Sequence, residues 1–248
     1  MARAAVRRRL TWQHAEVLAT TQETPRARRI RLRLPGWPGH AAGQHVDVRL
    51  TAPDGYTAQR SYSIASPPEE PEVDLVVERL DDGEVSPYLT DELRSGDLLE
   101  MRGPIGGYFV WPERSEAPVL LIAGGSGVVP FVAMLAHHRK TGSSVPVRLL
   151  YSVRTPADVI GGDEWLPRSS TEVVLTFTRD APSDWTGPVG RIDRDKLARH
   201  AVSPDRQPVI LVCGSTPFVE AVTRDLVAIG HAADRIKTER YGGIGGTS

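Results

Sequence analysis

The chain has 248 residues, enough for one large domain or two modest ones with a sizeable core. Its 40% hydrophobic and 25% charged residues are typical of a soluble globular protein. The net charge of −1 excludes a strong global attraction to nucleic acid or an anionic membrane, so we expect neither as a partner. Cys213 is the only cysteine, which excludes an internal disulfide and a cysteine-held iron–sulfur cluster and fits a reducing, cytoplasmic location.

Two segments of the chain resemble export or membrane signals. Basic residues at positions 3 and 7–9 start like a signal peptide, but no apolar segment follows them, so we expect none. Residues 117–136 carry no charge and are long enough to span a bilayer. Because glycines at 124, 125 and 127 and Pro130 interrupt them, we instead predict a buried strand, a glycine turn and a helix.

The first half of the chain alternates apolar and polar residues. This period of two predicts half-buried strands over 30–34 and 46–50, and 73–80 is predicted as another strand. Turn sequences separate these strands, among them Pro35-Gly36 and Pro53-Asp54-Gly55. We therefore expect a small antiparallel β-barrel, with one short helix over 86–94.

From about Trp111 onward the pattern changes to continuous apolar runs that alternate with helical spacing. Strands buried on both faces are predicted over 119–123, 147–153, 173–177 and 209–213. Pro130 suits the first turn of a helix, and apolar residues from 219 to 229 recur at helical spacing. Alternating strands and helices predict a doubly wound parallel α/β sheet. We assign 1–113 to the barrel and 114–248 to the α/β domain.

The first chemical motif is Arg60-Ser61-Tyr62-Ser63, which we expect just after a turn, opening a strand. A flavin needs a planar surface against its ring, a cation near its phosphate and a hydrogen-bond partner at N5. Tyrosine, arginine and serine supply these three groups. The alternative is a polar barrel strand whose tyrosine belongs to the core.

Two further motifs follow buried strands in the second half. Gly124-Gly125-Ser126-Gly127 would let the backbone approach a pyrophosphate at a helix N-terminus. The loop lacks the spacing of an ordinary Rossmann dehydrogenase, and no ribose-binding acid lies at the usual distance, so we reject that class. The other motif, Cys213-Gly214-Ser215-Thr216-Pro217-Phe218, ends the last main strand, where Cys213 could also be an ordinary small buried hydrophobe.

These three motifs, in this order and over almost the whole chain, resemble the ferredoxin–NADP reductase superfamily. The resemblance implies an FAD flavoprotein that takes a hydride from NADPH and passes single electrons to a separate carrier, by default ferredoxin or flavodoxin. It would be a stand-alone reductase without a fused iron–sulfur domain, and we expect a monomer. Two alternatives stay open: a free-flavin reductase, and a redox-sensing flavin-binding module without significant turnover.

The resemblance also implies roles for the flavin-binding residues. Tyr62 packs on the isoalloxazine ring, Arg60 reaches the phosphate and Ser63 faces N5. The resemblance further implies that the flavin pyrophosphate is bound by the strand and loop that carry Val77, Gly83, Val85 and Ser86. This second anion site favours FAD over FMN, although Ser86 could equally be the N-cap of an ordinary short helix.

On the coenzyme side, the resemblance implies that Gly124, Gly125, Ser126 and Gly127 bind NAD(P)H. It places Cys213 beside the nicotinamide C4 and the flavin N5, followed by Gly214. With Tyr62 and Ser63, Cys213 completes the expected catalytic set.

Coenzyme choice depends on two strand ends that we expect to be adjacent at the carboxyl edge of the sheet. These ends carry Ser152 with Arg154, and Thr178 with Arg179. Arginines and hydroxyls suit a 2′-phosphate, which predicts NADPH. NADH stays an alternative, because the two arginines could simply be solvated at the surface.

The end of the chain leaves its role open. Tyr241 matches the aromatic residue with which several relatives cover the flavin, but here seven residues follow it. Glu239 could relay a proton or be an exposed acid of the tail. The histidines show no metal-binding spacing, and His137 and His138 should point apart on a helix, so we expect no metal.

Overall fold

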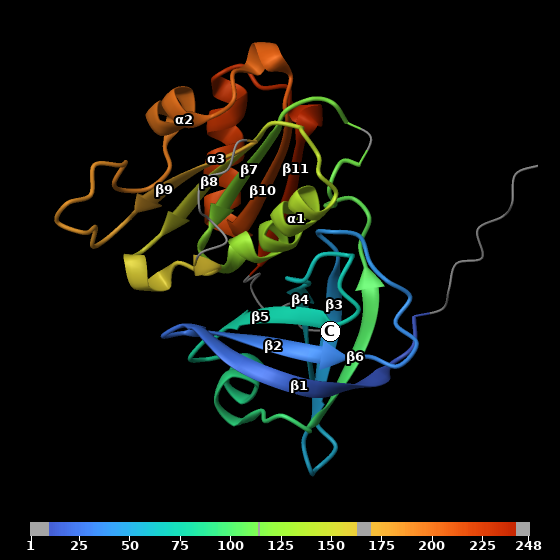
Figure 1. Ribbon diagram of the computed structural model, residues 1–248. Helices are drawn as coiled ribbons and strands as arrows, with labels where there is room; N and C mark the ends of the chain where they lie inside the picture. The colour runs from blue at the N-terminus through green and yellow to red at the C-terminus, as the bar shows by residue number, and fades with distance from the viewer. Residues whose placement is uncertain (1–9, 114, 163–169, 242–248) are drawn as a thin grey trace, which may run out of the picture.

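The computed structural model describes residues 10–113, 115–162 and 170–241. Its first half is a six-stranded antiparallel sheet that curls into the barrel at the bottom of Figure 1. The strands, which lie in the sheet order β4-β3-β6-β1-β2-β5, are β1 (Gln13–Thr24), β2 (Ala27–Arg33), β3 (His45–Thr51), β4 (Thr57–Ser63), β5 (Val73–Glu78) and β6 (Leu98–Ile105). A bridge between Ile64 and Leu75 brings the two edge strands β4 and β5 together. The expectation of an antiparallel barrel is confirmed.

The alternating pattern of the barrel strands gives one buried and one outer face. Ile30 and Leu32 of β2 are fully buried with Val46 and Val48 of β3, while the residues between them lie toward solvent or in ion pairs. β1 was not predicted, because its sequence contributes little more than Ala15 and Val17 to the core. The predicted short helix is present as one π-helical turn, η1 (Tyr88–Glu92).

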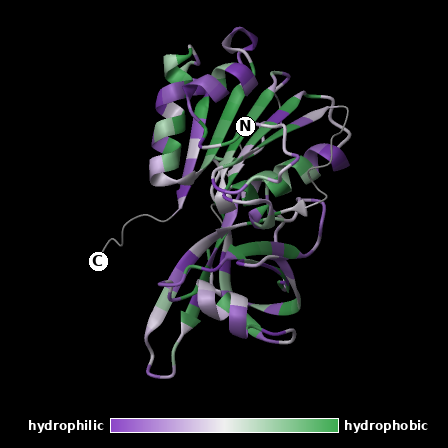
Figure 2. Cartoon of the chain, turned by 90° about the vertical axis from the view of Figure 1, so that its left-hand side faces the viewer, coloured by the Kyte–Doolittle hydropathy of each residue, from purple (hydrophilic) through white to green (hydrophobic). Residues whose placement is uncertain are grey.

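The second half is a five-stranded parallel sheet. Its strands, in the order β11-β10-β7-β8-β9, are β7 (Val119–Gly124), β8 (Val147–Val153), β9 (Thr171–Phe177), β10 (Val209–Ser215) and β11 (Ile236–Tyr241). Figure 2 shows the central strands as apolar along their length, as expected for a sheet covered on both faces. The chain runs outward from β7 to β9 and returns on the other side through β10, so the topological switch point lies between β7 and β10.

Helices cover both faces of this sheet, which confirms the doubly wound α/β architecture. α1 (Val129–Lys140) packs on one face together with Leu121 and Leu149, and it carries Pro130 in its first turn. α2 (Arg194–His200) and α3 (Thr216–Ala228) pack on the other face with Leu120 and Ile122. Neighbouring residues of β7 therefore point to opposite layers.

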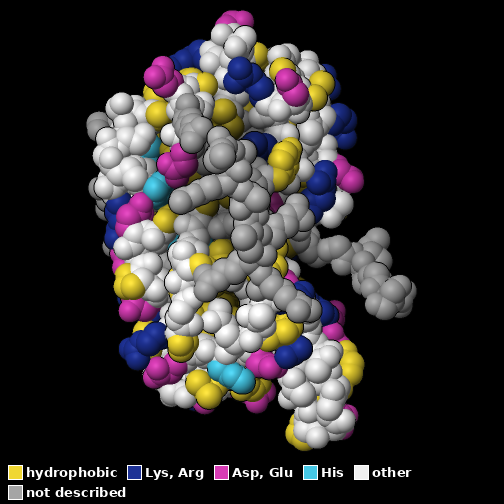
Figure 3. Space-filling view, turned by 90° about the vertical axis from the view of Figure 1, so that its right-hand side faces the viewer, with side chains coloured by type: hydrophobic (Ala, Val, Ile, Leu, Met, Phe, Trp, Pro, Cys, Tyr) yellow, Lys and Arg dark blue, Asp and Glu magenta, His cyan; other side chains and the backbone are white. Residues whose placement is uncertain are grey.

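The uncharged segment 117–136 divides into β7, a 3₁₀ turn η2 (Gly125–Val128) and most of α1, as predicted. Within the described ranges, no helix has the length and apolar character needed to cross a membrane. Figure 3 shows the side of the molecule that lies on the right in Figure 1. Basic and acidic side chains are interspersed among the described residues of this side.

The barrel and the parallel sheet share one apolar cluster. α1 contributes Phe131 and Met134 to it, and Ala42 and Trp111 join it from the barrel and its exit segment. Gly43 lies at the tightest point, since a Cβ there would collide with the Phe109 carbonyl oxygen and the Met134 methyl group. α1 is therefore packed directly against the barrel (Figure 1).

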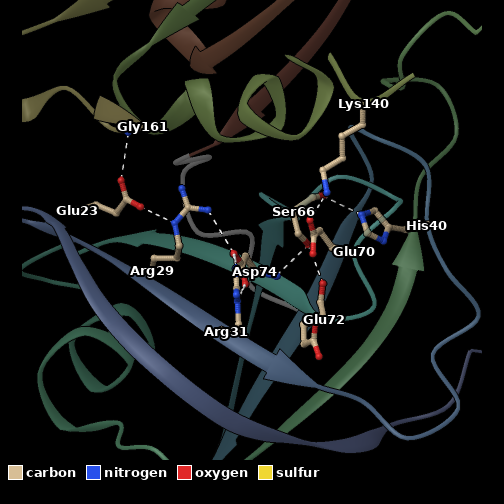
Figure 4. Close-up of polar contacts among 10 residues, drawn as sticks. All are labelled: Glu23, Arg29, Arg31, His40, Ser66, Glu70, Glu72, Asp74, Lys140 and Gly161. Carbon is tan, nitrogen blue, oxygen red and sulfur yellow. Dashed lines mark hydrogen bonds and ion pairs between the residues drawn. The ribbon is translucent and has the colours of Figure 1, made fainter. Parts of the chain in front are cut away.

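Polar contacts surround this apolar seam, and Figure 4 shows several of them. The Gly161 amide of the α/β half donates to Glu23 of β1, which accepts from Arg29. Arg29 and Arg31 both bond to the buried Asp74 of β5. Outside that chain of contacts, Lys140 of α1 pairs with Glu70 in the loop before β5.

Histidines 137 and 138 of α1 point to different partners, as predicted. His137 Nδ1 lies 2.5 Å from Glu69, and its Nε2 lies 2.8 Å from Glu113. His138 Nε2 lies 2.9 Å from the Val145 carbonyl oxygen. His137 thus joins α1 to two acidic segments at the seam.

We predict that Gly43→Ala destabilises the protein by about 2–4 kcal/mol, because it combines backbone strain at φ +102° with overpacking against a backbone carbonyl. Gly39→Ala is the matched control: Gly39 also has a positive φ, of +78°, but a Cβ there meets nothing within 4 Å. Denaturant unfolding of both variants measures the difference. Equal losses would show that the close approach of α1 at Gly43 is unimportant.

Candidate active site

The motif Arg60-Ser61-Tyr62-Ser63 forms the end of β4, not its beginning as predicted, because pairing with β3 starts at Thr57. Arg60 and Tyr62 oppose Val48 and Val46 of β3, whose side chains are in the barrel core. Tyr62 packs against that core, and burial raises the pKa of its hydroxyl above the ordinary value. β4 is the last strand of the sheet order, and its motif ends next to the Ile64–Leu75 bridge that joins β4 to β5.

Ser61 and Ser63 alternate with these residues and belong to the other face. Ser63 is the direct cross-strand partner of His45. Ser61 Oγ donates to Asp47 at 2.6 Å, and Arg102 donates to the same carboxylate at 2.9 Å. These bonds hold the edge strand in register.

Asp47 and its supports were not identified from the sequence. Asp47 is 5% exposed, and Arg102 beside it lies over the Trp12 ring at 4.8 Å from the ring centre. Arg49 lies over the same ring at 4.2 Å. Asp47 bonds to Ser61 only because β3 pairs with β4, and the sequence does not show this pairing.

The predicted pyrophosphate segment has a different internal structure from the one expected. Val77 and Val85 are fully buried, so only their backbone can face a ligand. The Ser86 hydroxyl accepts a bond from the Leu80 amide at 3.0 Å, and Gly83 lies directly beneath it. Ser86 therefore stabilises its own loop, and the alternative in which it is the N-cap of a short helix is not observed, because η1 has no side-chain cap.

Arg60 points toward this same loop and is already paired. Its guanidinium donates to Glu84 at 2.6 Å, and the Tyr56 hydroxyl donates to the other oxygen of Glu84, also at 2.6 Å. All three side chains are largely exposed at the edge of the barrel.

On the coenzyme side, the glycine loop packs closely against the end of β10. A Cβ on Gly127 would collide with the Cys213 carbonyl and lie 2.8 Å from the Gly214 amide. A Cβ on Gly124 would lie 3.0 Å from the Phe218 ring, and Gly125 has a positive φ of +55°. Only glycines permit this approach, which brings the loop that precedes α1 against the end of β10.

Tyr241 reaches the glycine loop from β11. Its hydroxyl donates to the Gly124 carbonyl oxygen at 2.7 Å. Burial raises the pKa of Tyr241 to about 12, against the opposing effect of hydrogen bonds with Ser126 and the Gly127 backbone. The Tyr241 side chain is thus held against the glycine loop, while the tail after it lies outside the described residues.

Cys213 and Glu239 meet at the junction of the two halves. They are register partners in β10 and β11, and Cys213 is 3% exposed. Glu239 Oε1 lies 3.9 Å from His45 Nδ1 of the barrel, and its Oε2 is buried with no partner among the described residues. Of the two alternatives left open for Glu239, the structure therefore does not support the exposed acid of a tail.

Burial determines the charge state of this cluster. It raises the pKa of Glu239 to about 7 and lowers that of His45. Burial, followed by the nearby Glu239, raises the pKa of Cys213 well above the ordinary value. Near neutral pH the cluster thus holds a neutral thiol and a carboxyl group that can give or take a proton.

The two strand ends expected to choose the coenzyme are adjacent, as predicted. Beyond β8 and β9, the Thr178 amide donates to Val153 at 2.8 Å and the Arg179 amide donates to Arg154 at 3.0 Å. Ser152 is buried, whereas Arg154 and Arg179 are exposed at the carboxyl edge of the sheet.

These features suit a flavin and a nicotinamide nucleotide. The glycine loop joins β7 to α1 in close contact with the end of β10, and an acid with one unpartnered oxygen among the described residues lies at the junction beside Cys213. In the part of the chain that the structure describes, no group of three or more histidine, cysteine or acidic residues could hold a metal ion. An open groove at the opposite edge of the parallel sheet, near Arg148 and Ser203, contains none of the sequence motifs.

Comparisons with known proteins agree with this arrangement. Residues 14–110 match the family model of the oxidoreductase FAD-binding domain, and residues 121–224 match that of the oxidoreductase NAD-binding domain. Ferredoxin–NADP reductase B of Sorangium cellulosum (strain So ce56) is 35% identical over 81% of this chain and 84% of its own length.

Two other similar proteins are longer than this chain. NADH oxidoreductase HCR of Escherichia coli (strain K12) is 33% identical over 85% of this chain, which spans only 62% of that protein. The crystal structure of Amycolatopsis cytochrome P450 reductase GcoB superposes with a TM-score of 0.81 at 26% identity, covering 95% of this chain and 72% of that one.

We predict that Glu239→Gln stabilises the protein at about pH 8 but not at about pH 4. The folded pKa of about 7 lies above the ordinary 4.5, so the wild type loses stability as the pH rises through this interval and the buried carboxylate ionises. Glutamine carries no charge, and the gain should reach at most about 3 kcal/mol. Denaturant unfolding at both pH values measures it, with the exposed Glu220→Gln as control. A gain that is independent of pH would contradict the raised pKa.

Proposed function

The chain belongs to the ferredoxin–NADP reductase family of flavin-dependent NAD(P)H oxidoreductases, and from that premise we propose that it binds FAD, accepts a hydride from NADPH and passes single electrons to a separate carrier. The observation that carries the proposal is the 3.9 Å approach of His45 to Glu239. It brings the flavin motif of the barrel to the coenzyme edge of the parallel sheet. Hydride transfer requires that the two bound rings lie in direct contact. The approach of His45 to Glu239 brings together the two segments expected to bind these rings. We place the boundary between the flavin domain and the coenzyme domain at residues 113 and 114.

On the flavin side, we assign Tyr62 to the face of the ring, Ser63 to N5 and Arg60 to the phosphate. Ser63 is supported by its pairing with His45, which puts it on the face that meets Glu239. The Gly83 loop contributes its backbone to the pyrophosphate, because Val77 and Val85 are buried and Ser86 braces the loop. Bound FAD would supply the conversion from hydride to single-electron chemistry.

On the nicotinamide side, the loop from Gly124 to Gly127 and the Gly214 amide approach the pyrophosphate at the start of α1. Tyr241 closes this loop from β11. Cys213, held neutral by burial, would lie beside the path between the two rings and would not act as a nucleophile. Glu239 and His45 hold or release a proton at the junction.

For the coenzyme we propose NADPH. Arg154 and Arg179 lie exposed on adjacent strand ends, where charge-assisted bonds to a 2′-phosphate can form. Thr178 directly precedes Arg179 in the sequence. Ser152 is a buried residue near the end of β8, at the same edge of the sheet.

For the acceptor we propose a ferredoxin or flavodoxin. The single Cys213 excludes a cluster held by cysteines within these 248 residues, so the proposed carrier lies outside them. Similarity to a cytochrome P450 reductase makes a haem protein the alternative acceptor.

A free-flavin reductase is the second candidate function. One observation favours it: the only cation assigned to the flavin phosphate is already engaged by Glu84. Retention of flavin through gel filtration separates a resident cofactor from a released substrate.

The function is tested by flavin content and rapid mixing. The purified protein should hold about one FAD, and anaerobic mixing with NADPH should bleach it within milliseconds to seconds. Slow bleaching would instead support a sensing module without turnover. Failure of the apo protein to bind added FAD would overturn the reductase proposal.

Cys213→Ala should slow flavin reduction at saturating NADPH while leaving FAD bound, because the side chain orients the reacting atoms. Cys213→Ser should be milder, as it keeps a small polar group. Stopped-flow reduction over a range of NADPH concentrations separates the rate constant from affinity. Full activity in the alanine variant would remove Cys213 from the site.

Arg154→Ala or Arg179→Ala should raise the KM for NADPH by about ten- to a hundredfold, since one charge-assisted bond contributes about 1.5–3 kcal/mol. The KM for NADH should barely change, because NADH lacks the 2′-phosphate. Steady-state kinetics with both coenzymes provides the comparison. Equal kcat/KM for NADH and NADPH in the wild type would contradict the NADPH assignment alone.

A further inference from the structure

Arg60 forms an ion pair with another side chain of the barrel in this structure. Its guanidinium bonds to Glu84 at 2.6 Å, and this carboxylate belongs to the Gly83–Ser86 loop assigned to the flavin pyrophosphate. An anionic side chain therefore lies where anionic phosphate oxygens are expected. The Tyr56 hydroxyl bonds to the remaining oxygen of Glu84 and fixes its direction.

One guanidinium cannot serve both anions in the same geometry without cost. A phosphate that approaches Arg60 must displace Glu84 or share the cation with it, and the two negative charges repel at short range. We propose that Glu84, oriented by Tyr56, competes with the flavin phosphate for Arg60 and thereby sets how tightly the protein holds a phosphorylated flavin. The proposal rests on the assignment of Arg60 to the flavin phosphate.

The surroundings keep Glu84 ionised and the pair easy to open. A hydrogen bond from Tyr56, followed by Arg60, lowers the pKa of Glu84 below its ordinary value. The side chains of Arg60 and Glu84 are 52% and 46% exposed. Exposed ion pairs are weak and are screened by salt, so this competitor tunes binding and does not block it.

The competition acts on the phosphate, not on the ring. Tyr62 and Ser63 lie two and three positions further along β4, where the strand reaches His45. A change at Glu84 should thus alter affinity for FAD and FMN alike, while riboflavin, which has no phosphate, should be unaffected. Weak retention of FAD would follow from the sequence of this loop and not from a defective ring site.

The experiment is a titration of the full-length apo protein with FAD, FMN and riboflavin, followed by flavin fluorescence, at low and high salt. Glu84→Gln removes the competing charge and keeps the side-chain size. Glu92→Gln removes an exposed carboxylate from η1 in the same region as the matched control. Tyr56→Phe frees Glu84 from its orienting bond, and Glu84→Gln combined with Arg60→Ala tests whether the effect passes through Arg60.

Glu84→Gln should tighten FAD and FMN binding by about three- to thirtyfold at low salt, less at high salt. Tyr56→Phe should give a smaller gain, and Glu92→Gln none. In the Arg60→Ala background the gain should shrink, since there is no longer a cation to release.

Other results overturn the proposal. Unchanged or weaker FAD binding in Glu84→Gln, with FAD bound by the wild type, rejects the competition and leaves the reductase function intact. An equal gain for riboflavin rejects an effect through the phosphate. If no variant, the wild type included, binds FAD, both the competition and the proposed function fail.

Discussion

The packing of α1 against the barrel is the constraint on which the rest of the structure depends. α1 begins at the glycine loop of the coenzyme site and buries Phe131 and Met134 in a cluster shared by both halves. Protein interiors are close-packed, so a helix fixed in this way cannot slide without opening a void. The position of the coenzyme loop relative to the flavin motif is therefore determined by apolar contacts before any ligand binds. Gly43 permits the closest of these contacts.

The carboxylates near this seam differ in whether their oxygens have hydrogen-bond partners. Asp74 is 3% exposed in its side chain and bonds to two arginines, and His137 lies between Glu69 and Glu113. Glu239, in contrast, keeps one buried oxygen without a partner in the described residues. An unsatisfied buried acid costs stability, and proteins usually pair such groups. In the proposed site this acid lies beside Cys213, its register partner in β10.

The sequence predicted those features of the fold that depend on the local pattern of apolar and polar residues. The bounds of β8 were predicted at 147–153, as observed, because a mostly apolar segment of this length indicates a strand buried on both faces. The motif of β4 was found, but its place at the end of the strand was not, since pairing with β3 decides where a polar strand begins. The segment that forms β11 was not predicted as a strand, because its sequence is mostly polar. Its burial, and that of Glu239, depends on parallel pairing with β10 and on His45 from the other half.

The Arg60–Glu84 pair could not be predicted for the same reason, since it joins two segments 24 residues apart. Its location separates two properties of the site. In the proposed function, retention of flavin depends on charges at the exposed edge of the barrel, where ion pairs are weak. The proposed hydride transfer depends instead on the junction of Ser63, Cys213 and Glu239, where packing between the two halves fixes the geometry. Substitutions at the edge can thus change how long a flavin stays bound without moving the reacting groups. On this proposal, one exposed carboxylate adjusts how tightly a flavin is retained and leaves the fold and the proposed hydride path unchanged.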